Sequence, residues 1–97
     1  MSQANANNLL NRLATGKPLI SDGATWTYLQ QHGLKPWQCA EEFNLTKGYV
    51  VADMAKAYFE AGAEMALTNT FGGNRYNLNK YDLGDHVRDF NVEAAKL

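Results

Sequence analysis

The 97-residue sequence carries nine Lys and Arg against ten Asp and Glu, a formal net charge of −1, and is 45% hydrophobic. This length allows one small domain or a piece of one, and the hydrophobic fraction predicts a core-forming chain. There is no basic stripe for nucleic acid, no polybasic cluster for anionic lipid and no signal peptide. The apolar runs are shorter than the roughly 20 residues that span a bilayer. A single cysteine, Cys39, excludes an internal disulfide framework and is typical of a reducing compartment. We therefore predict a cytoplasmic protein whose partners are neither nucleic acid nor membrane.

The beginning of the chain is polar and then becomes helical. Residues 1–8 are rich in Asn, and we expect them to be disordered. Leu9, Leu10 and Leu13 recur at helical spacing and predict a short helix that stops near Gly16.

Two short apolar runs, each followed by a polar turn with glycine, predict two strands. The first contains Leu19 and Ile20, and the second covers residues 64–70. Between them an amphipathic helix is expected to begin at the N-cap Thr46 and to stop at Gly62. A strand, a helix and a second strand joined by a tight turn favour parallel pairing through a right-handed crossover. Further helices are predicted over residues 24–32, 74–81 and from about 85 onwards, with a loop or broken helix over 34–44.

The resulting fold class is α/β, with about two parallel strands and covering helices. Two strands leave two open sheet edges and too little partner surface for an independent sheet. The elements amount to roughly a quarter of an eight-stranded barrel. We therefore predict that residues 1–97 form the N-terminal part of a single (β/α)8 TIM-barrel domain. A separate 97-residue fold, completed by oligomerisation, remains the alternative.

The predicted strand ends carry the residues best suited to binding. Parallel α/β proteins place their chemistry at the carboxyl ends of the strands, where Asp22 and Asn69 would both lie. Asp22 can accept hydrogen bonds from a ligand ammonium, and Gly23 lets the backbone approach a ligand. Alternatively, Asp22 caps the next helix and Gly23 only makes the turn.

The second strand end raises the same two interpretations. The segment 68–73 reads Thr-Asn-Thr-Phe-Gly-Gly, so Asn69, Thr70, Phe71 and Gly72 either line a pocket or form a polar strand end with a flexible turn. No metal-binding constellation is formed by Cys39, His32 and His86, because they lack the paired spacing of zinc ligands. The adjacent acidic residues Glu41 and Glu42 could serve as a general acid or base, but such pairs in a loop are mostly solvated or capping groups.

Several segments in this order resemble the homocysteine S-methyltransferase family from about residue 19 to residue 97. The matching segments are 22–24 with Thr27, 39–44, 58–64 running into 68–72, 81–83 and 91–95. The Glu-Ala-Gly-Ala to Thr-Asn-Thr-Phe stretch is the most specific of them. The resemblance implies a (β/α)8 barrel that transfers a methyl group to the thiol of homocysteine and forms methionine.

The resemblance also implies a set of site residues and a cofactor. Asp22 would hold the amino group of homocysteine, backbone near Gly23 would help at its carboxylate, and Phe71, Gly72 and Asn74 would lie near the pocket. A zinc ion held by three cysteine thiolates would bind the substrate sulfur and keep it a thiolate. Those cysteines are expected beyond Leu97, so none of the present residues is assigned as a catalytic residue or a metal ligand.

The methyl donor and the partners stay open at this point. The donor would be betaine, S-methylmethionine or a folate acting through a corrinoid protein, and a homo-oligomer is a further partner to consider. The family often has Met-Gly where this chain has Thr25-Trp26, which points to a different pocket shape. A related barrel enzyme with another donor or substrate, or a non-catalytic binding or assembly module, are therefore the alternative functions.

Overall fold

In the computed structural model, residues 3–97 are described, with side chains from Leu9 onwards. Residues 1–8 are predicted to be disordered. Of these, positions 1–2 lie outside the described residues, and positions 3–8 are described by their backbone alone. In chain order the elements are α1 (Gln3–Ala14), α2 (Trp26–Gln31), the 3-10 turn η1 (Ala40–Glu42), α3 (Phe43–Thr46), α4 (Gly48–Glu60), α5 (Arg75–Leu78), η2 (Asn79–Tyr81), η3 (Gly84–His86) and α6 (Val87–Lys96). None of the helices within residues 3–97 is both long and apolar enough to cross a membrane.

The helices lie close to where the sequence predicts them, whereas their caps differ. Helix α4 ends before Gly62, whose φ of 115° is a left-handed conformation that suits glycine. Its start is not capped by Thr46, because the Thr46 hydroxyl donates to the Glu42 carbonyl at 3.1 Å inside α3. The N-cap of α4 is Lys47, without a side-chain hydrogen bond. Helix α4 therefore begins about one residue later than the sequence predicts.

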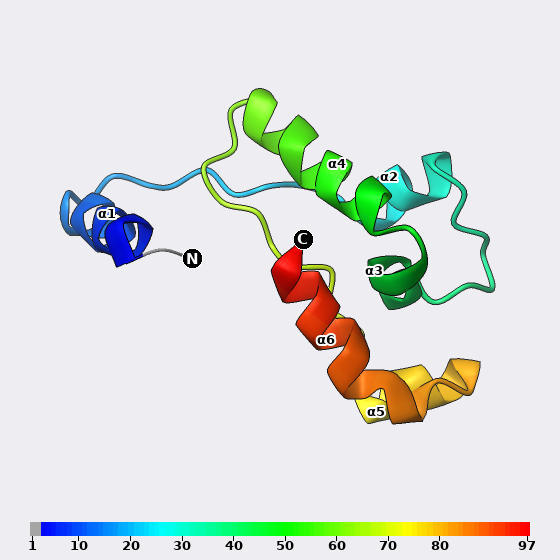
Figure 1. Cartoon of the computed structure of the whole chain (residues 1–97). Helices are drawn as coiled ribbons and strands as arrows, with labels where there is room; N and C mark the ends of the chain where they lie inside the picture. Colours follow the sequence, from blue (N-terminus) through cyan, green and yellow to red (C-terminus); the bar gives the residue numbers. More distant parts are fainter. Residues whose placement is uncertain (1–2) are drawn as a thin grey trace.

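Two small hydrophobic clusters hold helices α2 to α6 together, and these helices are called the helical body below. The larger cluster joins α2, α3 and α4 through Leu29, Leu34, Ala40, Phe43, Val50, Val51 and Met54. The smaller cluster joins α5 and α6 through Cys39, Leu78 and Phe90. Helix α3 contacts both α4 and α6, so it lies where the two clusters meet (Figure 1).

The predicted α/β fold class, with its two parallel strands and TIM-barrel arrangement, is wrong for this structure. Residues 3–97 contain helices and no strand, and the two extended segments share one parallel bridge, between Ser21 and Met65. Around the bridge, the Ile20 carbonyl accepts hydrogen bonds from the N–H groups of Glu64 and Met65 at 2.7 and 3.2 Å. The physical reason is a lack of neighbours: Ile20 is 59% exposed and Leu67 75% exposed, so no second layer covers the pair.

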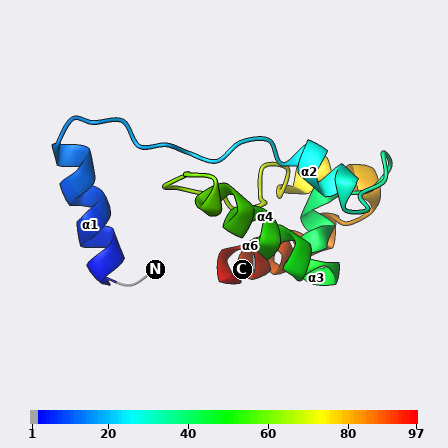
Figure 2. The same ribbon diagram turned by 90° about the horizontal axis from the view of Figure 1, so that it is seen from above.

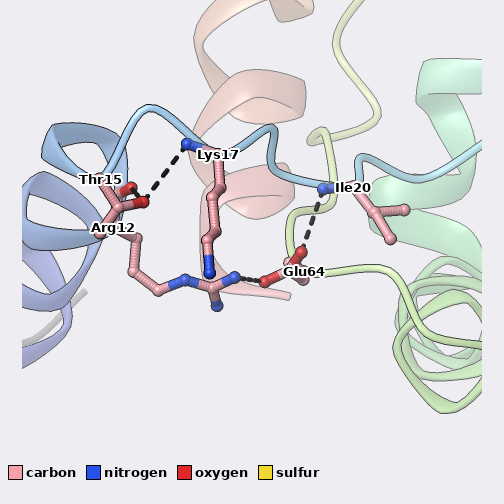
Figure 3. A network of polar contacts seen from close by, with 5 residues as sticks. All are labelled: Arg12, Thr15, Lys17, Ile20 and Glu64. Carbon is pink, nitrogen blue, oxygen red and sulfur yellow. Dashed lines mark hydrogen bonds and ion pairs between the residues drawn. The ribbon is translucent and has the colours of Figure 1, made fainter.

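Helix α1 stands apart from the helical body at the end of an extended segment (Figures 1 and 2). Figure 3 shows the polar contacts near its attachment. The Arg12 guanidinium pairs with the Glu64 carboxylate, and Oε1 of that carboxylate also accepts the Ile20 N–H at 3.3 Å. At the helix end, the Thr15 hydroxyl donates to the Arg12 carbonyl at 2.7 Å and accepts the Lys17 N–H at 3.3 Å. These contacts are at the surface, and of the α1 side chains that are described, those of residues 9–14, none belongs to either hydrophobic cluster.

Candidate functional site

Asp22 links the two extended segments through its carboxylate. Oδ2 accepts the Leu67 backbone N–H at 3.0 Å, and Oδ1 accepts the Ser21 hydroxyl at 3.2 Å. The N-cap of α2 is Thr25, so Asp22 does not cap the following helix, which was one of the two interpretations of its role. Its half-buried carboxylate instead faces the segment that carries the other predicted site residues.

Tyr58 on α4 fixes the turn that follows Asp22. Its hydroxyl donates to the Ala24 carbonyl at 2.6 Å. The phenol ring lies against Gly23, where an added Cβ would come within 3.1 Å of Cε1. Glycine at this position therefore allows close packing of the ring, beyond its use in a turn.

Asn69 was predicted to line a pocket, and its side-chain NH2 group faces the protein interior. It is 6% exposed, and its Nδ2 donates to the Ala40 carbonyl at 2.8 Å and to Asn44 Oδ1 at 3.1 Å. Asn44 returns the contact, because its Nδ2 donates to the Asn69 carbonyl at 2.8 Å and to the Phe90 carbonyl at 3.1 Å. The two amides therefore join the 66–70 segment to η1, α3 and α6, a structural role that the sequence did not reveal.

The next three predicted site residues have very different surroundings. The Thr70 and Thr68 hydroxyl groups lie 2.8 Å apart, on the same side of the segment. Phe71 is 99% exposed, so its ring is free to contact a ligand or another surface. Gly72 is half-buried: its carbonyl accepts Asn77 Nδ2 at 2.9 Å, and a Cβ built at this position would lie 2.7 Å from Glu41 Oε1.

Glu41, interpreted from the sequence as a solvated or capping group, is a buried acidic residue beside this site. It is 4% exposed, and its Oε1 lies 3.7 Å from the Cys39 thiol, which donates to it. Burial raises the pKa of the Glu41 carboxyl, and hydrogen bonds from Cys39 and from the Gly72 backbone oppose that rise. Burial, followed by the charge of Glu41, raises the pKa of the Cys39 thiol, which keeps it protonated at neutral pH. The only sequence signal for Glu41 was its place in the segment 39–44 that matches the family.

A cavity of about 190 Å³ has both Asp22 and Asn69 in its wall. Its remaining lining comes mostly from apolar side chains of α4, the 66–68 segment and the end of α6, including Met54, Phe59 and Leu67. Asp22 also borders a second, more open hollow of about 320 Å³, together with Gly23 and Tyr58. The described lining of neither hollow includes Trp26, the residue expected to change the pocket shape.

The described side chains do not form a metal site. His32 stacks on Tyr28 with ring centroids 4.3 Å apart, whereas His86 lies beside Asp89 with Nδ1 3.3 Å from Oδ2. Cys39 is a buried free thiol beside Glu41. From Leu9 to Leu97 no three His, Cys, Asp or Glu side chains gather in a way that would hold a cation.

Comparison with known proteins gives a consistent result. The family model described as homocysteine S-methyltransferase matches residues 19–97. The methionine synthase of Mycobacterium leprae (strain TN) is 39% identical over 98 aligned residues, which cover 93% of this chain and 8% of that protein. The methionine synthase of Mycobacterium tuberculosis (strain ATCC 25618 / H37Rv) is 40% identical over 87 residues, 81% of this chain and 7% of that protein. This chain therefore spans less than a tenth of the length of either relative, and no solved structure matches it.

Proposed function

This chain belongs to the homocysteine S-methyltransferase family, as its motifs predicted, and we propose that it supplies part of the homocysteine-binding site of a methionine synthase-like enzyme. In this proposal the enzyme transfers a methyl group to the homocysteine thiol and forms methionine. The present residues recognise the amino-acid part of the substrate.

The observation that supports the proposal most is the shared cavity of Asp22 and Asn69. These residues are 47 positions apart in the sequence, yet both line the same hollow of about 190 Å³. A carboxylate and an amide beside apolar walls are the groups that suit a small zwitterion with a short aliphatic side chain, because few polar groups fix such a ligand while apolar contacts fill the space.

Asp22 is the residue assigned to the substrate ammonium group. Its oxygens each accept one hydrogen bond, from Leu67 N–H and from Ser21. A carboxylate has about four acceptor sites, so it retains capacity for an ammonium donor. Backbone near Gly23 is assigned to the substrate carboxylate.

The residues Thr70, Phe71 and Gly72 are assigned to the edge of the same site. The exposed Phe71 ring offers an apolar surface, and the Thr70 hydroxyl offers a polar contact. The Asn69 amide combines a wall position in the cavity with its structural hydrogen bonds.

The described residues do not fit the zinc ion that the family resemblance implies. A zinc site of this kind needs several thiolate or imidazole ligands close together. The Cys39 thiol is buried and protonated, and it donates a hydrogen bond to Glu41. The proposal therefore concerns substrate recognition by this chain, and it assigns thiol activation and the methyl donor to no residue of this chain.

A chimeric enzyme tests the proposal. This chain replaces the aligned residues of the Mycobacterium tuberculosis methionine synthase, and the KM for homocysteine is measured with and without Asp22→Asn. The amide keeps an oxygen for Leu67 N–H but loses the negative charge, so we expect the KM to rise about ten- to a hundredfold, as for loss of a charged hydrogen bond. Asp53→Asn, on the exposed face of α4, is the matched control. An unchanged KM in the Asp22→Asn chimera would refute the assignment of Asp22.

A further inference from the structure

The turn over residues 69–73 is held by side chains from four different elements. Three of these contacts are amide groups that donate to backbone carbonyls: Asn44 to Asn69 at 2.8 Å, Asn77 to Gly72 at 2.9 Å and Asn91 to Gly73 at 2.8 Å. The fourth is the Glu41 carboxylate, whose Oε1 lies 2.7 Å from the position that a Cβ on Gly72 would take. Three carbonyls of one short turn are thus each matched by a side-chain amide, and a carboxylate packs against Gly72, which fixes the turn as a unit.

Glu41 differs from the three amides because it is ionisable. It is almost fully buried, and the ion pairs found among residues 9–97 do not include it. Its oxygens face neutral donors, the Cys39 thiol and the Gly72 backbone. A buried carboxylate without a cationic partner costs stability, so the folding of the helical body does not by itself explain an acid at this position.

Gly72 is the residue that allows this contact. A Cβ at this position would lie 2.7 Å from Glu41 Oε1 and would also collide with the Asn77 amide. Any larger residue would displace the carboxylate, the amide or the turn. The carboxylate and the glycine therefore depend on each other.

We infer that Glu41 is a positioning residue for substrate binding, which holds the turn 69–73 so that Thr70 and Phe71 face the ligand. The inference rests on the proposed function, since these two residues are assigned there to the homocysteine site. Glu41 itself does not touch the substrate; it acts through the backbone of Gly72. Its acceptor oxygen carries this role, so an uncharged acceptor of the same shape is able to replace it.

Nuclear magnetic resonance on the 97-residue chain separates the two proposals. Hydrogen exchange of the Gly72 amide is measured without ligand, and amide shifts of Asp22, Thr70 and Phe71 are measured on addition of L-homocysteine. The chains compared are the parent, Glu41→Ala, Glu41→Gln and the control Glu42→Gln, which changes the half-buried neighbour.

We expect Gly72 exchange to be about tenfold faster in Glu41→Ala, the size of one lost hydrogen bond, and close to that of the parent in both Gln variants. The homocysteine-induced shifts of Thr70 and Phe71 are expected to weaken in Glu41→Ala and to be restored in Glu41→Gln. Gly72 exchange that is equal in Glu41→Ala and the parent would overturn the positioning role. The proposed function is overturned separately, by an unchanged KM for homocysteine in the Asp22→Asn chimera, whereas the exchange measurement needs no ligand.

If Glu41→Ala does not fold, the parent chain alone provides the test. The Gly72 amide proton shift is then followed while the Glu41 carboxyl is titrated. A shared midpoint supports the contact, and a Gly72 shift that does not follow the carboxyl overturns it.

Discussion

The two halves of the proposed site are held in different ways. On one side, Asp22 lies on an exposed extended segment that is tied to its neighbour by one parallel bridge and a few hydrogen bonds. On the other side, the turn 69–73 is enclosed by Asn44, Glu41 and further amides from the helical body. Local stability therefore differs between the two sides of the proposed site. The turn is part of the packed helices, whereas the Asp22 segment is joined to them by few contacts.

The largest effect should come from the core beneath the site, and it sharpens the contrast with the Asp22 segment. Leu29→Ala empties a fully buried position of the larger cluster and is expected to lower the free energy of unfolding by about 2–5 kcal/mol. Ile20→Ala, in the exposed segment, is expected to cost about 0.5 kcal/mol or less. Urea unfolding measures both, and similar costs at the two positions would contradict the comparison.

Breaking the amide network should have the next largest effect. Asn69→Leu removes one of two donors from the Ala40 carbonyl and leaves the side-chain oxygen of Asn44 without its donor, and we expect a loss of about 2–3 kcal/mol in unfolding free energy. Thr68→Val, one residue earlier and exposed, is the control and should change the unfolding free energy little. If Asn69→Leu is as stable as the control, the turn is not part of the helical body.

The charge of Glu41 should make the stability of the turn side depend on pH. Burial raises its native pKa above the usual 4.5, so between that value and the native pKa the folded chain binds more protons than the unfolded chain. The contribution to stability is therefore fully present below 4.5 and is lost as the pH rises through the native pKa. Relative to the parent, Glu41→Gln should gain stability between acidic and neutral pH, as measured by urea unfolding across that range. Parallel pH curves for the variant and the parent would show that the carboxyl is not perturbed.

The smallest effect is expected where α1 attaches to the Asp22 side. Arg12→Ala removes the contact with Glu64, which lies at the surface, and should change the unfolding free energy by about 0–1 kcal/mol. The same variant should raise amide exchange in the α1 segment, because that ion pair joins α1 to the second extended segment (Figure 3). Exchange that is unchanged throughout α1 would mean that other contacts hold the helix.

Part of the site was predictable from the sequence because its signals are local or carried by motifs. Asp22, Gly23 and the segment 69–72 were candidate binding residues from their place after apolar runs and from the family motifs, and the structure brings Asp22 and Asn69 to one cavity. Their role in binding homocysteine stays a prediction. Glu41 and Asn44 were missed as site residues, because a pair of acidic residues in a loop gives no local sign of burial.

Local sequence patterns were enough to predict the helical segments and the family. Periodic leucines and stop glycines depend on neighbours within a few positions, so α1, α2 and α4 follow from local pattern, and the ordered motifs over residues 19–97 indicated the homocysteine S-methyltransferases. Tertiary structure decided what depends on distant residues. Strands need partners on their edges and faces, and the segments around Ser21 and Met65 find only one bridge, so they remain extended chain. The burial of Glu41 against Gly72 likewise exists only because a turn 31 residues away folds over it.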